Sequence, residues 1–536
     1  MEAHGGRLAV EVLQRHGVEV MFTLSGGHLF VLYDGAVQAG LRLVDTRHEQ
    51  TATFAAEGWA KVTRRLGCAA LTAGPGITNG VSAMTAAGMN GSPMVVIGGR
   101  APQLRWGAGS LQELDHVPIV APVVKRAATA TSSASIVDEI DAACRAARMP
   151  HRGPAFVDIP LDVFGPAGVE LPAVDDGTLR GDDPDPGDVK AVAALVAAAE
   201  RPVLFAGGDV YWAHAEEPMA AFAEAARIPV FVNGMGRGTI PADHELAFSR
   251  ARSNALKDAD LVLVAGTPLD FRLGFGRFGT APVVHLCDAA AGVAQHAELA
   301  ASTGGDLAAT FRQLAELVTP AGTESWIARL RDDERAKRAV EAGSLEDASA
   351  PIKPTRIYGE LRRRLDRDAI VIGDGGDFVS YAGKLIDSYH PGTFLDPGPY
   401  GCLGMGPGYA LAAGLAHPDR QVVLMLGDGA AGFALGDFEA LVRHGVDVVA
   451  IVGNNGIWGL EKHPMQALFG YDVVAELSPG IRYDEVVRAL GGDGECVREP
   501  DDIGPALDRA FSTKGVSLIN VLTDPADAYP RSSNLA

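Results

Sequence analysis

The sequence predicts an α/β protein made of three doubly wound parallel-sheet domains. Short runs of Val, Leu, Ile and Ala that end in Gly, Asp or Asn alternate with Ala-rich helical stretches along the chain. This alternation is typical of parallel strands that are covered by helices on both faces. The length of 536 residues is too great for one ordinary core, and an apolar content of 47% is enough to fill several.

Two acidic segments rich in Pro and Gly, residues 165–188 and 341–354, interrupt the alternation and have the composition of linkers. They divide the chain into domains at residues 1–165, 189–340 and 355–523, with a C-terminal tail at 524–536. Each block has a size suited to one doubly wound domain. The alternative is that the two segments are long surface loops within fewer domains.

Charge and composition exclude several classes of function. The chain carries 46 basic and 67 acidic residues, a net charge of −21, which disfavours nucleic acid as a partner. No apolar run reaches the roughly 18 residues of a membrane span, and the N-terminus has the pattern of an amphipathic helix rather than a signal peptide. The five cysteines are scattered without a CxxC pair, as in reduced thiols, so we expect a cytoplasmic protein.

Unusual polar sequences follow the predicted strands of the first and third blocks. In the first block they are FTLSGGH (22–28), DTRHEQ (45–50) and LTAGPGITNG (71–80), and in the third they are IGDGGDF (372–378), MLGDGAAGF (425–433) and VGNNGIWG (452–459). Because α/β folds bind ligands at the carboxyl ends of their strands, these two blocks are expected to form the functional pair.

The strongest motif is Gly427-Asp428-Gly429 at the end of an apolar strand, followed 27 residues after Asp428 by Asn455 at the end of another. Mg²⁺ prefers oxygen ligands and commonly bridges a carboxylate to a phosphate. Asp428, the Asn455 amide and the main-chain carbonyl of Ile457 supply such oxygens. The N–H groups of Gly429 and Ala430 at a helix start would face the anion. A Gly-Asp-Gly turn alone is more often structural.

The combination of Gly-Asp-Gly, a helix and a buried strand, and then Asn-Asn resembles the signature of thiamine-diphosphate enzymes. That resemblance implies thiamine diphosphate and Mg²⁺ as cofactors. Thiamine diphosphate reacts only after its thiazolium carbon loses a proton to its own aminopyrimidine arm, which a carboxylic acid must first tautomerise. Glu49, in RHEQ followed by AAEGWA and TAGPG, matches that acid. Without this context, Glu49 would be a solvated residue at a helix N-terminus.

The same resemblance names the first block a pyrimidine-binding domain, the second a central nucleotide-binding-like domain and the third a diphosphate-binding domain. It implies a homodimer or homotetramer whose active sites are shared between subunits. Leu403 in PYGCLGMG matches the hydrophobic fulcrum that bends the cofactor, with a buried core leucine as the alternative. The residues expected at the cofactor are Gly26, Gly27, Gly74, Asn79, Gly376, Asp377, Gly401, Leu403, Gly427, Gly429, Ala430, Asn455 and Ile457.

Longer stretches resemble the acetolactate-synthase-like group, most closely the 2-hydroxyacyl-CoA lyases: VDTRHEQTATFAAEGWAK, TAGPGITNGVSAM, GSLQELDH, GPAFVDIPLDV and ALKDADLVLVAGTPLDFRLGFGR. Such lyases reversibly cleave a 2-hydroxyacyl-CoA to formyl-CoA and an aldehyde or ketone. The alternatives are a carboligase or decarboxylase of 2-keto acids, oxalyl-CoA decarboxylase, and a regulatory homologue without activity. Leu111-Gln112 stands where the decarboxylase has Tyr-Glu, which disfavours that activity.

The resemblance also suggests residues that contact the substrate. His28 is expected near the reacting carbon as acid or base, Gln112 at the thioester, and Glu461 at the 2-hydroxyl group. Turn stabilisation by His28 and a structural hydrogen bond from Gln112 are the alternatives. For the CoA moiety, whose site ADP could also fill, the candidates in the central domain are Arg237, Arg252, Ser253 and Asp288, with ordinary surface or capping roles as the alternative. Arg531, Ser532 and Ser533 are candidates in a tail that would close over the site, with a disordered terminus as the alternative. FAD is not expected.

Overall fold

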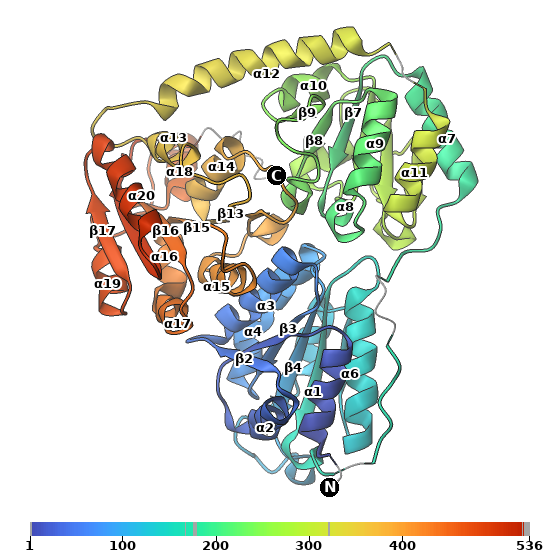
Figure 1. Cartoon of the computed structure of the whole chain (residues 1–536), viewed down its shortest axis with the longest axis vertical. Helices are drawn as coiled ribbons and strands as arrows, with labels where there is room; N and C mark the ends of the chain where they lie inside the picture. Colours follow the sequence, from blue (N-terminus) through green and yellow to red (C-terminus); the bar gives the residue numbers. More distant parts are fainter. Residues whose placement is uncertain (1–2, 167, 175–178, 320–321, 528, 530–536) are drawn as a thin grey trace.

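The computed structural model describes residues 3–166, 168–174, 179–319, 322–527 and 529. They form three six-stranded sheets in which all paired strands are parallel, and helices cover both faces of each sheet (Figure 1). The predicted fold class is confirmed. Among the described helices, none combines the length and the hydropathy needed to cross a membrane.

The first sheet has the strand order β2-β1-β3-β4-β6-β5. Its helices and strands are α1 (Gly5–Arg15), β1 (Val20–Thr23), α2 (Phe30–Ala39), β2 (Arg42–Asp45), α3 (Glu49–Thr63), β3 (Gly67–Leu71), α4 (Pro75–Met89), β4 (Met94–Arg100), α5 (Val117–Val120), β5 (Arg126–Thr129), α6 (Ser133–Arg148) and β6 (Pro154–Pro160), with the short 3₁₀ helix η1 (Gly27–Leu29) after β1. The order changes direction between β1 and β3, which places a ligand crevice at their carboxyl ends.

The third sheet repeats this topology, with the order β14-β13-β15-β16-β18-β17. Its elements are α13 (Pro354–Arg362), β13 (Ile370–Asp374), α14 (Gly376–Leu385), β14 (Phe394–Leu395), α15 (Gly406–Ala416), β15 (Val422–Gly427), α16 (Asp428–Ala434), α17 (Phe438–Arg443), β16 (Val448–Asn454), α18 (Gly459–Phe469), α19 (Tyr483–Ala489), β17 (Asp493–Val497), α20 (Ile503–Ser512) and β18 (Val516–Leu522). Here the direction changes between β13 and β15, so the loops after these strands line the corresponding crevice.

The central sheet has the different order β12-β11-β10-β7-β8-β9. Its elements are α7 (Pro186–Ala198), β7 (Pro202–Ala206), α8 (Gly208–Trp212), α9 (Glu216–Ala226), β8 (Val230–Val232), β9 (Ala247–Phe248), α10 (Arg252–Asp258), β10 (Leu261–Ala265), β11 (Val283–Cys287), β12 (Ala301–Gly304), α11 (Leu307–Leu317) and the long α12 (Glu324–Leu345), which runs from the central sheet towards the third (Figure 1). This is the order of dinucleotide-binding sheets, with its crevice beyond β7 and β10.

The first and third sheets share a hydrophobic core, whereas the central sheet has its own. One buried cluster joins Phe22 and Phe54 of the first sheet and its helices to Tyr409 and Leu424 of the third. A separate cluster lies within residues 189–330. Helix α3 packs along α15 at the shared core, so the N-terminus of α3 is held in a fixed position relative to the third sheet.

Candidate active site

Glu49 is the first residue of α3, four residues after the end of β2. The helix begins here because the His48 side chain accepts a hydrogen bond from the Gln50 N–H, which satisfies one of the free donors of the first turn. Glu49 is 8% exposed, and the Asn79 amide donates to its Oε2 over 3.0 Å. The Glu49 side chain is therefore buried and held in one orientation at the edge of the first sheet where its strands end.

His28 lies at the same edge, in η1. Its side chain is buried, with Nδ1 3.3 Å from the Thr72 hydroxyl oxygen. Burial lowers the pKa of His28 below its usual 6.5, because the charged imidazolium is poorly solvated there. Gly26 is needed for the close approach of the two loops, since a Cβ atom at Gly26 would lie 2.3 Å from Cβ of Thr72. His28 is thus neutral at pH 7 and able to accept a proton.

Gly74 and Gln112 come from different loops and touch. Gly74 has φ +63°, and a Cβ atom placed on it would lie 3.0 Å from Cβ of Gln112. Gln112 itself has φ +57°, a left-handed conformation that costs energy for a residue with a side chain and that is common at functional sites. By contrast, a Cβ atom at Gly27 would meet nothing within 4 Å, so the chain leaves open space in front of that loop.

Asp428 and the turn at 455–457 meet at the carboxyl edge of the third sheet. Asp428 Oδ2 accepts a hydrogen bond of 2.7 Å from the Gly456 N–H, and Oδ1 accepts one of 3.0 Å from the Gly429 N–H. The Asn455 side-chain oxygen accepts from the Ile457 N–H over 3.2 Å. The structure therefore brings together the carboxylate, the amide and the turn that the sequence proposes as magnesium ligands.

The donor chemistry of this turn suits a hard cation. Asp428 is 3% exposed, and burial raises its pKa to about 6; a divalent cation would favour the ionised form. Asn455 adds an amide oxygen, and the buried Ile457 supplies a main-chain carbonyl. These are oxygen donors without sulfur or imidazole, as Mg²⁺ requires.

Glycines allow other side chains to pack closely in the space in front of α16. Gly427 precedes the helix as its N-cap residue, and a Cβ atom at Gly429 would lie 2.4 Å from the ring of Trp458. Gly375, before α14, faces this space too: its Cβ would lie 2.4 Å from Cβ of Ala430 and 3.2 Å from Cδ2 of Leu403. Because Gly427 and Gly429 carry no side chains of their own, the main-chain N–H groups of this helix start can face an anion.

Leu403 lies in this arrangement because a buried carboxylate holds its loop. Asp374, 0% exposed, accepts hydrogen bonds from the N–H groups of Gly404 and Gly406 over 3.1 and 2.8 Å, and burial raises its pKa to about 7. Sequence reasoning missed Asp374, although it ends the strand of the IGDGGDF motif. Leu403 is thus placed beside Gly375 and Ala430, as a fulcrum residue would have to be.

The other residues predicted at this edge of the third sheet follow three of its strands, β13, β14 and β16. Gly376, with φ +55°, and the buried Asp377 begin α14, and a Cβ atom at Gly459 would lie 2.4 Å from Oδ2 of Asp377. Gly401, with φ +72°, ends a short 3₁₀ turn just before Leu403. Glu461 is exposed in the first turn of α18, so the structure leaves its carboxylate at the surface of this chain.

Helix α3 is attached to the third sheet by contacts that the sequence did not reveal. The Arg47 N–H and the Thr51 hydroxyl donate to Asp437 over 2.7 and 2.8 Å. Further along the helix, Lys61 and Glu57 form a buried ion pair of 3.0 Å within α3. Both residues also bond the Tyr409 hydroxyl of α15, which accepts from Lys61 over 2.8 Å and donates to Glu57 over 2.7 Å. These contacts fix Glu49 relative to the loops of the third sheet.

Three of the CoA candidates line one cavity. Arg237, Arg252 and Ser253 contribute to a cavity of about 1060 Å³ between the central and third sheets. The Arg237 guanidinium, however, donates to the main-chain carbonyls of Gly383 and Ile386, and Arg252 donates to the carbonyl of Arg272 over 2.8 Å. Both guanidinium groups therefore already bond main-chain carbonyls of the protein, which leaves fewer of their N–H groups for a ligand.

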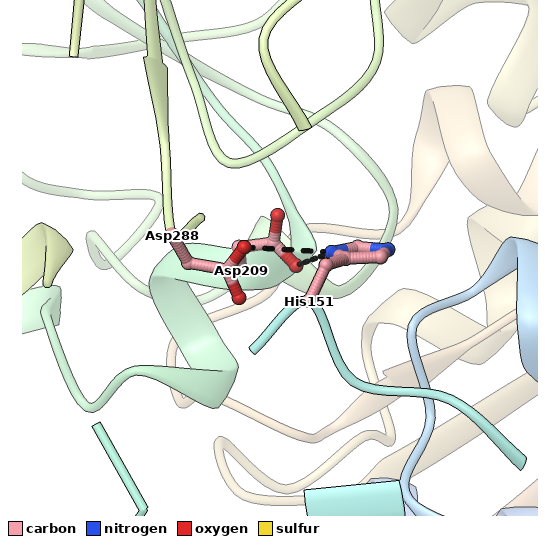
Figure 2. A group of neighbouring side chains, drawn as sticks. All are labelled: His151, Asp209 and Asp288. Carbon is pink, nitrogen blue, oxygen red and sulfur yellow. Dashed lines mark ion pairs between the residues drawn. The ribbon is translucent and has the colours of Figure 1, made fainter. Parts of the chain in front are cut away.

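Asp288 lies elsewhere, at a junction between the first and central domains. His151 Nδ1 is 3.1 Å from Asp209 Oδ1 and 3.6 Å from Asp288 Oδ1 (Figure 2), and Arg152 donates to Asp288 Oδ2 over 3.3 Å. The neighbouring carboxylates, Asp209 above all, raise the pKa of His151 to about 10. His151, Asp209 and Asp288 could each offer one ligand atom to a metal ion, and these three atoms lie within 4.8 Å of one another. The side chains of His151 and Arg152, however, already pair with the two carboxylates, as in an interdomain ion-pair network.

Arg531, Ser532 and Ser533 lie outside the described residues. The predicted closure of the tail over the site therefore remains a prediction.

Family models and relatives show the family to which the chain belongs. Residues 3–119 match the N-terminal thiamine pyrophosphate binding domain of thiamine pyrophosphate enzymes, residues 189–314 their central domain, and residues 374–521 their C-terminal thiamine pyrophosphate binding domain. The chain is 55% identical to the acetolactate synthase large subunit IlvG of Mycobacterium tuberculosis, over 99% of this chain and 98% of that protein. It is 33% identical to 2-hydroxyacyl-CoA lyase 2 of Caenorhabditis elegans (98% and 90% covered) and 32% identical to that of Homo sapiens (93% and 86% covered). The chain belongs to the thiamine pyrophosphate enzymes, in their acetolactate-synthase-like group.

Proposed function

We propose that this enzyme is a carboligase that decarboxylates one 2-keto acid and joins the remaining acyl group to a second carbonyl compound. The observation that carries the proposal is the 55% identity to an acetolactate synthase over 99% of the chain. Pyruvate is the first substrate to test, with two pyruvates giving one acetolactate and one CO₂. When bound, thiamine diphosphate supplies the carbon nucleophile and the electron sink for this chemistry.

The third sheet would hold Mg²⁺ and the diphosphate group of the cofactor. Asp428, Asn455 and the Ile457 carbonyl would ligate Mg²⁺, and the N–H groups at the start of α16 would face the phosphates. Leu403 would support the bend of the cofactor between its two rings. The buried contacts of Asp374 keep this leucine in place.

Proton transfer would belong to the first sheet. The Glu49 carboxyl would donate to the pyrimidine ring, and Asn79 keeps it oriented for that purpose. His28, neutral because of its burial, would accept or return a proton at the reacting carbon. Gln112 would donate a hydrogen bond to the carbonyl oxygen of the substrate.

Glu49 and Asp428 would act in one site across a subunit boundary. We propose a homodimer, or a tetramer of two such dimers, in which Glu49 of one chain serves the diphosphate held by Asp428 of the other. This arrangement follows from membership of the family, and the fixed position of α3 gives each chain a rigid surface on which to present Glu49.

A 2-hydroxyacyl-CoA lyase is the second candidate. It is favoured by relatives of that name that match nearly the whole chain and by the cavity lined by Arg237, Arg252 and Ser253, which could receive the CoA phosphates. Asp288 is engaged by Arg152 and His151, so it offers little to an adenosine ribose, whether of CoA or of FAD. We expect no bound flavin.

One assay with two arms distinguishes the candidates. Purified protein with thiamine diphosphate and Mg²⁺ is given a panel of 2-keto acids, scored for CO₂ and for the condensed product, and in parallel a panel of 2-hydroxyacyl-CoAs, scored for formyl-CoA. Consumption of pyruvate or another 2-keto acid with a condensed product supports the carboligase. Formyl-CoA without turnover of any 2-keto acid would replace it with the lyase. A Glu49→Gln variant controls for contaminating activity, and the visible absorbance spectrum tests for flavin.

A further inference from the structure

The buried side chain of His116 connects the loop after β3 to strand β6 in the first sheet. His116 Nε2 accepts a hydrogen bond of 2.9 Å from the main-chain N–H of Gly74. Its Nδ1 lies 2.9 Å from Oδ2 of Asp158, which is in β6. Because a main-chain N–H can only donate, Nε2 is unprotonated and the hydrogen lies on Nδ1, facing the carboxylate. His116 is therefore a neutral connector with a defined tautomer.

Arg100 extends this network and balances the charge of the Asp158 carboxylate. Arg100 Nη1 donates to the same Asp158 oxygen over 2.8 Å, and its Nη2 is 3.0 Å from Asp115. The guanidinium also lies over the Trp106 ring at 4.0 Å. His116 and Asp158 are both 0% exposed, so burying them has a large desolvation cost that an apolar pair would avoid. Such a network favours one loop geometry, because the loss of any of these hydrogen bonds would leave a buried polar group without that partner.

The loop held by His116 carries two of the substrate-side contacts. Thr72, two residues before Gly74, is the partner of His28. Gly74 itself, in a left-handed conformation, packs against Gln112, which is also left-handed. If the hydrogen bond between Gly74 and His116 were lost, both loops could relax from these conformations, and His28 and Gln112 would move relative to each other.

We propose that His116 is a positioning residue for the substrate side of this active site. Through the Gly74 N–H it fixes the loop at residues 72–76, and with it the spacing of His28 and Gln112 around the reacting carbonyl. The inference rests on the proposed function, since it assigns His116 to that same site. Asp158 and Arg100 act through His116, by fixing its tautomer and orientation.

Three substitutions separate the two contacts of His116. In His116→Gln the side-chain oxygen can take the place of Nε2 and still accept from Gly74, whereas in His116→Asn the amide can still donate to Asp158 but no longer reaches Gly74. His116→Phe fills the volume and makes neither bond. We expect kcat/KM within about threefold of wild type for His116→Gln and about 10- to 100-fold lower for the other two, the usual effect of misplacing catalytic groups.

Two further readouts exclude a purely structural role. The thiamine diphosphate dissociation constant should change much less than kcat/KM in His116→Asn, because Mg²⁺ and the diphosphate are expected on the third sheet. Amide exchange over residues 72–76 should be faster in His116→Asn than in His116→Gln. Equal kcat/KM for the Asn and Gln variants, or a loss that parallels cofactor affinity and melting temperature, would overturn the inference. If the wild type turned over no 2-keto acid and no 2-hydroxyacyl-CoA, the proposed function would fail instead, and the exchange comparison would still decide whether His116 holds the loop.

Discussion

Removing Lys61 should strongly destabilise the junction between the first and third sheets. Lys61 and Glu57 are 1% and 0% exposed and 3.0 Å apart, and Glu57 also accepts hydrogen bonds from Tyr409, Asn90 and Ser92 over 2.7, 2.8 and 3.1 Å. Burial and the adjacent Glu57 raise the pKa of Tyr409 far above its usual value, so the phenol remains a neutral donor. In Lys61→Met the Glu57 carboxylate would stay buried without a cation.

The size of the effect follows from this geometry. Breaking a buried ion pair by removing one partner costs about 3–5 kcal/mol. For a cooperative unit of domain size, this corresponds to a fall in the apparent melting temperature of roughly 6–20 °C. The three remaining neutral donors to Glu57 favour the lower half of that range, about 3–4 kcal/mol.

A double variant tests the reasoning behind this magnitude. Lys61→Met with Glu57→Gln replaces the buried charges with a thioether and a neutral amide, so it should recover a large part of the lost stability. The measurement is thermal and urea unfolding of the wild type, both single variants and the double variant. If the double variant were as unstable as the sum of the single ones, the cost would not arise from an unpaired buried charge, and the account of this junction would be refuted.

Three other predictions concern the third sheet and the interdomain ion pair. Asp428→Asn should weaken binding of thiamine diphosphate with Mg²⁺ by about 10- to 100-fold or more, as measured by calorimetry, and binding equal to wild type would exclude Asp428 as a metal ligand. Gly429→Ala places a methyl group 2.4 Å from the Trp458 ring and should raise the cofactor dissociation constant, with partial recovery when Trp458→Leu is added; no change in either variant would contradict the crowding. The pKa of His151 is raised to about 10, so the stabilising contribution of its charge is complete below about pH 6.5 and is lost as pH rises through 10. The wild type should therefore lose more free energy of unfolding between pH 7 and pH 10 than His151→Gln does. Parallel pH profiles of the two proteins would refute this.

The fold class could be predicted because strand and helix patterns are local. Alternation of apolar strands with Ala-rich helices identified the three parallel sheets. Four of the six polar motifs follow the strands at the two changes of strand direction, β1 and β3 in the first sheet and β13 and β15 in the third, and the other two follow the adjacent strands β2 and β16. Topology alone brings such loops together. Asp428 and the turn of Asn455 could therefore be paired from their positions after neighbouring strands.

Residues that act through long-range contacts could not be found in this way. Asp374 and His116 hold active-site loops through main-chain N–H groups, and the identity of such a partner leaves no mark in the sequence around either residue. The GSLQELDH stretch contains His116, but nothing in it indicates that its histidine meets Gly74 and Asp158. Similarly, Arg237 and Asp288 both follow strands of the central sheet, yet they lie at different cavities because the first domain brings His151 and Arg152 to Asp288.

Mixing two inactive variants tests most directly whether an acid of one chain acts on a cofactor held by another. At a thiamine diphosphate concentration that just saturates the wild type, Glu49→Gln and Asp428→Asn homodimers should each have little activity. After dissociation and random reassociation, each mixed dimer would contain one site with both residues intact, so activity should return to about one quarter of the wild-type value. Failure of the mixture to recover any activity, although mixed dimers form and both variants bind wild-type partners, would show that Glu49 and Asp428 do not meet across the subunit boundary.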